Sequence, residues 1–193
     1  MLRAMVQSRC KALMLGMFLS IVLFPCGSKW IVEGGVSSAS EHDISANLTL
    51  QISKFVTWPK RSARGSDRPF FIIGVMGDRN TQSAFKKLNG IRLKGLTVRI
   101  VRILPSTDHR EIRRCHIVYS DGAHNVDVVK DMIGGAKGVL SVCGTRAKAI
   151  GNTCVMFVRK GRGLGFDVDL KCTRSAGLSL DAGLLRLARN VKK

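Results

Sequence analysis

The spacing of hydrophobic residues changes along this chain, and it predicts which segments are helices and which are strands. Between residues 44 and 56 apolar positions recur every three or four residues, which predicts a helix that ends before Pro59. Residues 70–76 form a nearly continuous apolar run, the pattern of a buried strand. The same criteria predict strands at 98–103, 116–119 and 139–142, and helices at 81–88, 108–114 and 125–133.

The last third of the chain has a different pattern. Two apolar stretches, 155–158 and 164–170, flank a glycine-containing segment at 160–163, which predicts a hairpin, and a helix is expected at 181–191. The preceding alternation of strands and helices favours parallel strands with right-handed crossovers. We therefore expect an α/β fold, a three-layer α/β/α sandwich with a mixed, mostly parallel sheet and a late antiparallel hairpin, in a single domain over residues 44–191.

The N-terminal segment has the pattern of an export signal. An apolar run at 12–24, too short to span a membrane comfortably, is ended by Pro25. The basic residues that precede this run are Arg3, Arg9 and Lys11. Residues 1–28 are thus predicted to be a signal peptide, with cleavage after Ser28 or as late as Ala39.

The formal net charge of the 193-residue chain is +19, which favours acidic partners such as nucleic acid, anionic lipid or an acidic protein surface. The basic residues are spread along the sequence, and no RNA-recognition aromatic motif, zinc finger or basic helix is present. Together with export, this makes nucleic acid an unlikely partner. Binding of another polyanion remains an alternative, and it predicts strong salt dependence.

Four cysteines follow the leader: Cys115, Cys143, Cys154 and Cys172. In an oxidising compartment such residues commonly form disulfides. Cys143 and Cys154 flank one loop between strands expected to be neighbours, so a disulfide between them is the favoured pairing. Cys115 with Cys172 is the remaining pair, and buried thiols without any disulfide are the alternative.

No catalytic constellation is visible in the sequence. Cys115 and His116 are adjacent in a strand and point to opposite faces, so they cannot easily act together. The histidines lack the spacing of zinc ligands, and no serine stands in a G-x-S-x-G motif. We therefore predict a binding protein without enzymatic activity, metal or cofactor.

Two aromatic residues near the end of the first predicted helix are candidates for ligand binding. Phe55 and Trp58 are three residues apart and can lie on one helical face. Such a pair can offer an aromatic platform to a small ligand, and packing of the helix against the core is the alternative.

Several of these segments together resemble the YfiR-like family. The segments that carry the resemblance are 54–59 (KFVTWP), 72–78 (IIGVMGD), 165–170 (GFDVDL), 174–178 (RSAGL) and 184–189 (LLRLAR). The resemblance extends over roughly residues 44–191. It implies a periplasmic protein that binds the outer domain of an inner-membrane diguanylate cyclase and represses it, which lowers cyclic di-GMP and biofilm formation. It also implies stabilising disulfides and a homodimer.

The leading hypothesis is therefore a non-enzymatic periplasmic regulator. Its contact with the cyclase is expected near the hairpin and the C-terminal helix, at Phe157, Phe166, Leu180 and Arg186. The alternative is a periplasmic small-ligand sensor without a cyclase partner, which would use Phe55 and Trp58.

Overall fold

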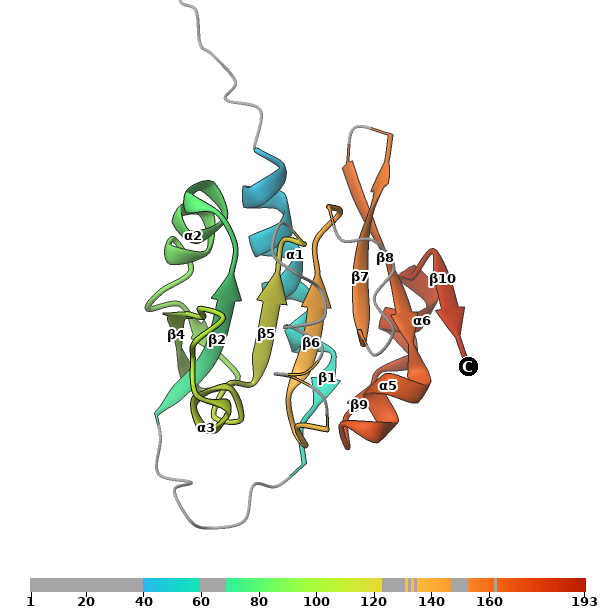
Figure 1. The fold of residues 1–193 in the computed structure, drawn as a ribbon. Coiled ribbons are helices and arrows are strands. Elements are labelled where there is room, and N and C mark those ends of the chain that lie inside the picture. Colours follow the sequence, from blue (N-terminus) through green and yellow to red (C-terminus); the bar gives the residue numbers. More distant parts are fainter. Residues whose placement is uncertain are drawn as a thin grey trace, which may run out of the picture. The chain divides into compact units, whose positions relative to one another are not determined.

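The computed structural model describes residues 40–59, 69–122, 131, 133, 135–146, 153–161 and 163–193 (Figure 1). The predicted signal peptide lies outside the described residues, and so does most of the helix expected at 125–133.

The described residues form one large sheet and one small one. The large sheet has eight strands in the order β10-β8-β7-β6-β5-β2-β4-β3. Neighbouring strands are parallel except in the hairpin of β7 with β8 and in the pair β3 with β4. The strand bounds are β2 Phe70–Met76, β3 Arg92–Leu93, β4 Leu96–Arg102, β5 Ile117–Ser120, β6 Leu140–Cys143, β7 Val155–Lys160, β8 Gly163–Asp169 and β10 Asn190–Lys192. The predicted mixed, mostly parallel sheet with a late hairpin is confirmed.

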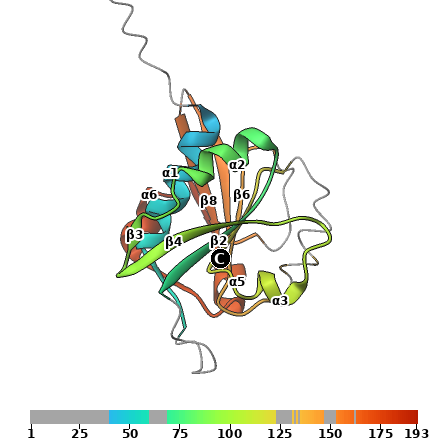
Figure 2. The ribbon, with the colours of Figure 1, turned by 90° about the vertical axis from the view of Figure 1, so that its left-hand side faces the viewer.

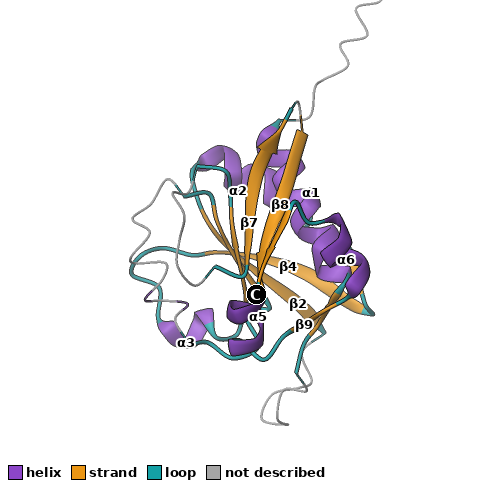
Figure 3. Ribbon diagram, turned by 90° about the vertical axis from the view of Figure 1, so that its right-hand side faces the viewer, coloured by secondary structure: helices purple, strands orange, loops and turns teal. Residues whose placement is uncertain are grey.

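Helices cover both faces of this sheet. One face carries α1 (Glu41–Lys54), α2 (Arg79–Lys86) and α6 (Ala182–Leu187), whereas α3 (His109–Ile112) and α5 (Leu170–Ser175) lie on the opposite side (Figures 2 and 3). Because successive strand residues point to opposite faces, β2 contributes to both cores. Ile73 and Val75 belong to the larger hydrophobic cluster, and Met76 belongs to the smaller one on the side of α3. The predicted three-layer sandwich is confirmed.

The first helix begins and ends earlier than the sequence pattern indicated. Ser40 accepts a hydrogen bond from the backbone N–H of Asp43 and so caps α1. The helix ends at Lys54 because Val56 and Thr57 form β1 (Val56–Thr57), a strand that the pattern did not predict. This strand pairs antiparallel with β9 (Ser179–Leu180), and the two make the small sheet.

The C-terminal segment is not one helix over 181–191, and that prediction was wrong. Within this segment α6 ends at Leu187, and the chain then forms β10, which pairs parallel with β8. The backbone N–H of Arg189 donates to the carbonyl of Phe166 at 2.8 Å, and its guanidinium contacts the carboxylate of Asp167. These contacts to β8 replace the last turns of the expected helix. The helix α5, capped by Asp169, was also not predicted.

Candidate functional site

The order of the strands changes direction at β2. From β2 the chain continues through β3 to β4 on one side and then crosses to β5 on the other side of β2. In open α/β sheets the carboxyl ends of strands at such a change of direction are the usual place for ligands and functional side chains. Here Asp78 follows β2 and Asp121 follows β5.

Asp121 is buried, with an exposed fraction of 3%, and its carboxylate has polar partners. It accepts the backbone N–H of Asp78 at 2.9 Å and the hydroxyl of Thr81 at 3.2 Å. A carboxylate that leaves water needs such donors to compensate its desolvation. Asp121 thereby joins the ends of β2 and β5 to the start of α2.

Asp78 caps α2 and faces a cation. Its carboxylate accepts the backbone N–H of Thr81 at 2.8 Å and pairs with the Arg146 guanidinium at 2.9 Å. The Thr81 N–H, with Arg146 beside it, holds the pKa of Asp78 well below the usual range of a carboxyl group, against a smaller opposing effect of burial. This pairing fixes Arg146, which follows β6, beside the carboxyl end of β2.

The first turn of α1 completes this polar cluster. His42 Nδ1 lies 3.1 Å from Thr81 Oγ1, and its Nε2 lies 3.3 Å from an Arg146 nitrogen. Glu41 accepts a hydrogen bond from the Thr145 hydroxyl and pairs with Arg159 at 2.7 Å. Among the described residues, the cluster is a network of ion pairs and hydrogen bonds that joins the first turn of α1 to the sheet and to α2.

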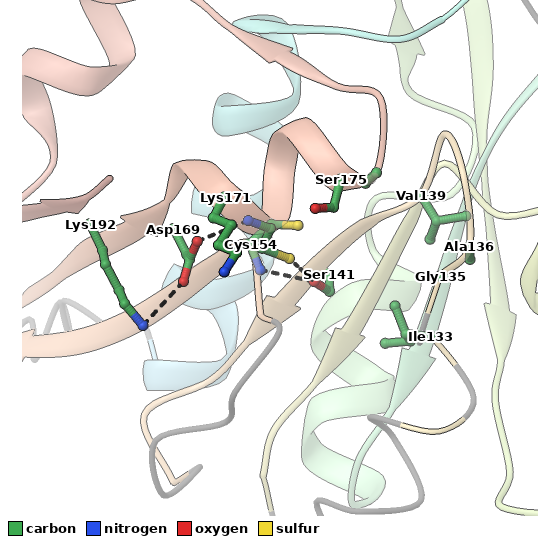
Figure 4. A pocket seen from close by; sticks show the side chains of 12 residues that line it. Ile133, Gly135, Ala136, Val139, Ser141, Cys154, Asp169, Lys171, Ser175 and Lys192 are labelled. Atoms are coloured by element: carbon green, nitrogen blue, oxygen red, sulfur yellow. Dashed lines mark hydrogen bonds and ion pairs between the residues drawn. The ribbon is translucent and has the colours of Figure 1, made fainter.

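A cavity of about 360 Å³ lies on the opposite face of the sheet, beside α5 (Figure 4). Its polar lining includes Ser141, Asp169 and Lys171, and Asp169 pairs with Lys192 at 3.6 Å. Cys154 and Cys172 also line it, and Figure 4 shows Cys154 beside Ser141. The cavity therefore combines thiols with charged side chains.

Phe55 and Trp58, the candidate ligand-binding residues, lie outside α1, and their role in binding stays a prediction. Phe55 is the C-cap of α1, whereas Trp58 lies beyond β1, so the two do not share a helical face. The Trp58 indole N–H donates to the carbonyl of His116 at 3.2 Å, its ring packs edge-on against Phe71 with centroids 5.2 Å apart, and the ammonium of Lys94 lies 5.5 Å above it. These contacts fit the alternative of packing against the core, because Trp58 is partly buried against the larger hydrophobic cluster.

The four residues predicted to contact a partner have different environments. Phe157 and Phe166 are paired across the hairpin of β7 and β8, and both are buried. Their side chains therefore lie beneath the surface of the hairpin in this structure. Leu180 is half-buried in β9, and Arg186 is exposed on α6. Leu187 on α6 was not among the predicted contact residues, and its side chain is 70% exposed.

No disulfide joins the four cysteines that the structure describes. The Cys143 sulfur lies 3.5 Å from the Thr153 hydroxyl, and burial raises the pKa of the Cys143 thiol to about 11. The thiol of Cys154 instead contacts that of Cys172. Strands β6 and β7 are neighbours, as expected, and the Cys143–Cys154 disulfide stays a prediction.

Two further observations concern the part of the chain that the structure describes. It contains no cluster of histidine, cysteine and acidic residues able to hold a metal ion. In the same residues, every helix is too short or too polar to traverse a bilayer.

Comparison with known proteins identifies the family. The model of the YfiR/HmsC-like family matches residues 42–189. The chain belongs to this family. Members of the YfiR/HmsC-like family are periplasmic regulators of diguanylate cyclases. No curated protein gives a significant match to the chain.

Two solved structures share the fold at low sequence identity. A conserved domain protein from Vibrio cholerae O1 biovar El Tor str. N16961 is 10% identical with a TM-score of 0.52, covering 79% of this chain and 60% of that one. An ABC domain from Streptococcus pneumoniae, in complex with L-Trp, is 10% identical with a TM-score of 0.50, covering 78% and 60%. The chain thus spans about three fifths of each of these proteins, and the likeness shows the α/β fold alone.

Proposed function

We propose that this protein is a periplasmic regulator that binds the periplasmic domain of an inner-membrane diguanylate cyclase and represses it. Repression lowers cyclic di-GMP and disfavours biofilm formation. The observation that carries the proposal is the YfiR/HmsC-like match over residues 42–189, which takes in nearly all of the described fold. The protein acts by binding and has no catalytic activity of its own.

The C-terminal surface, which we define as Leu180, Arg186 and Leu187, is the proposed contact. On α6 the buried Leu184 fixes the helix to the core and leaves Leu187 and Arg186 facing water. An exposed leucine beside an arginine provides apolar contact area together with a positive charge. The net charge of +19 favours a partner domain with an acidic face.

The test is binding of the exported protein to the purified periplasmic domain of a cyclase encoded next to it. We expect Leu187→Asp to weaken binding at least about tenfold, because it places a charge in an apolar contact. Leu104→Asp is the matched control, since Leu104 is also an exposed leucine (44%) but lies beyond β4. Absence of binding by the unmodified protein at tens of micromolar would contradict the proposal.

Sensing of a small ligand at Phe55 and Trp58 receives less support. The indole N–H of Trp58 is already bonded to the protein, and its ring contacts Phe71 and Lys94. A ligand would have to displace these groups before it could stack on the ring. A metabolite screen read by Trp58 fluorescence in a Trp30→Phe background tests this alternative, and a saturable change would revive it.

A further inference from the structure

We propose that Cys154 and Cys172 are a redox-active dithiol that closes to a disulfide in the exported protein. The two residues belong to different elements that the hairpin brings together. Asp169, at the end of β8, donates its backbone N–H to the carbonyl of Cys154 at 3.0 Å. The Asp169 carboxylate caps α5 by accepting the backbone N–H of Cys172 at 2.8 Å. One residue therefore holds the backbones of both cysteines.

The side chains of the pair also meet. The thiols of Cys154 and Cys172 are close enough to interact, and this interaction is the largest cause of the pKa shift of each. The Ser141 hydroxyl accepts the backbone N–H of Cys154 at 2.9 Å (Figure 4). It also lies 3.8 Å from the sulfur of Cys172, so it contacts both residues. Thiols in contact need only a small adjustment to reach disulfide geometry.

Neither of the other cysteines offers a comparable arrangement. Cys143 is opposite Met156 in the ladder, whereas extending the register places Cys154 opposite Ser141. A diagonal offset of two residues on adjacent strands separates Cα atoms by about 8 Å, beyond the reach of about 7 Å that a disulfide allows. Cys115 belongs to the smaller hydrophobic cluster with Ile112 and Met76.

The chemistry of the pair fits thiol–disulfide exchange. The hydrogen bond from Cys172 lowers the pKa of the Cys154 thiol, against the opposing effect of burial, and the same contact together with burial raises the pKa of Cys172. A stabilised thiolate is the reactive form of cysteine. Both residues line the 360 Å³ cavity beside Lys171 and Asp169, which gives a disulfide donor a route to the pair.

The reaction consumes one disulfide of an oxidant, either a thioredoxin-type protein or a small-molecule disulfide. One thiolate of the pair attacks the oxidant's disulfide, forms a mixed disulfide and releases one thiol of the oxidant. The second cysteine loses its proton to water and attacks the first sulfur, displacing the oxidant's other thiol. The pair thus gives up two protons and two electrons, and the oxidant's disulfide is reduced to two thiols. The new bond fixes the start of α5, and with it the chain leading to β9 and α6, to β7.

Peptide mapping tests this pairing directly. The protein purified from the periplasm is treated with oxidised glutathione, alkylated and digested with trypsin without reduction. Lys and Arg residues separate all four cysteines in the sequence, so each falls in its own peptide. We expect the peptides of Cys154 and Cys172 to be linked. A Cys143–Cys154 link, or four alkylated cysteines in the folded oxidised protein, would overturn the proposal.

Thermal unfolding gives a second readout that does not depend on the map. Reduction is expected to lower the Tm of the unmodified protein by about 5 °C or more, because the unfolded chain gains freedom. Cys172→Ser should have the Tm of the reduced protein and no response to reductant, and its half-buried site next to Ser141 accommodates a hydroxyl. Cys143→Ser, the matched control, should keep the full response. Loss of the response in Cys143→Ser and its retention in Cys172→Ser would refute the pairing.

Discussion

The two faces of the large sheet are built differently, although the same strands form both. The face under α1, α2 and α6 holds the larger hydrophobic cluster, which includes Phe85 and Phe157, both almost fully buried. The face toward α3 holds a smaller cluster, and two cavities lie on the side of the sheet where α3 and α5 are found. One is the 360 Å³ cavity beside Cys154, and the other, of about 410 Å³, lies over β2 and β4 and is lined by Ile72, Val101 and Arg99. We call these the closed face and the open face.

This difference separates stability from reactivity within one sheet. Tight packing on the closed face gives each buried side chain many neighbours, so removing atoms there leaves a cavity that the structure cannot fill. On the open face the side chains already border space, and small groups can approach Cys154 and Cys172. We therefore expect substitutions on the closed face to lower the free energy of unfolding strongly and those on the open face to lower it weakly.

Neighbouring isoleucines of β2 provide the sharpest test of this difference. Ile73 points to the closed face and is fully buried, whereas Ile72 points to the open face, is half-buried and lines the 410 Å³ cavity. We expect Ile73→Ala to lower the free energy of unfolding by about 2–5 kcal/mol and Ile72→Ala by about 1 kcal/mol. Urea unfolding of both variants measures the two losses. Equal losses would show that the two faces are packed equally well.

Gly74 in β2 and Gly77 just after it allow the two faces to be compared by adding a methyl group instead of removing atoms. A Cβ at Gly77 would lie 2.7 Å from both Asp121 Oδ2 and Thr81 Cγ2, groups held by the polar cluster. A Cβ at Gly74 would meet Ile103 Cγ1 at 2.9 Å and the Cys115 sulfur at 3.0 Å, side chains that border the 410 Å³ cavity and can move toward it. We expect Gly77→Ala to cost about 2–3 kcal/mol and Gly74→Ala about 1 kcal/mol in thermal or urea unfolding. A larger loss in Gly74→Ala would mean that the open face is as rigid as the closed one.

The sequence pattern was a good guide to the strands of both faces and a poor guide to the ends of the chain. Strands such as 70–76 are apolar throughout because helices cover both of their faces, and this pattern is local. The end of α1 and the replacement of the last helical turns by β10 depend on pairing with distant strands. Val56 pairs with Leu180, and Val191 pairs with Val168. No property of the residues near Val56 or Val191 indicates these partners, so the pattern extended each helix too far.

The candidate site was less predictable than the fold. Asp78 and Asp121 each follow a predicted strand, and this signal could have pointed to the polar cluster because the carboxyl ends of parallel strands lie at the same end of a sheet. The contacts of His42 and Arg146 link residues more than a hundred positions apart, which only the folded chain reveals. In the same way, Cys154 meets Cys172 because Asp169 turns the chain back at the start of α5.

The polar cluster at the edge of the closed face supports a smaller, pH-dependent prediction. The pKa of Asp78 is lowered in the folded protein by the Thr81 N–H and by Arg146, so its ionised form stabilises the fold. This contribution is complete above the ordinary carboxyl pKa of about 4 and is lost as pH falls toward the lower folded pKa. Asp78→Asn should therefore cost about 0.5–1 kcal/mol at pH 7, a small amount because the ion pair is 37–47% exposed.

The difference in free energy of unfolding between the unmodified protein and Asp78→Asn should shrink as the pH falls from 4 toward 2. The unmodified protein then loses the carboxylate charge that the variant never had. Urea unfolding at several pH values measures this difference. Asp108→Asn, at the N-cap of α3 on the open face, is the matched control, since asparagine caps a helix about as well as aspartate. We expect the control to differ little from the unmodified protein. A constant difference between the Asp78→Asn and unmodified proteins from pH 7 to pH 2 would show that the carboxylate of Asp78 contributes through its shape and hydrogen bonds, and that its charge adds nothing to the attachment of α1 and α2.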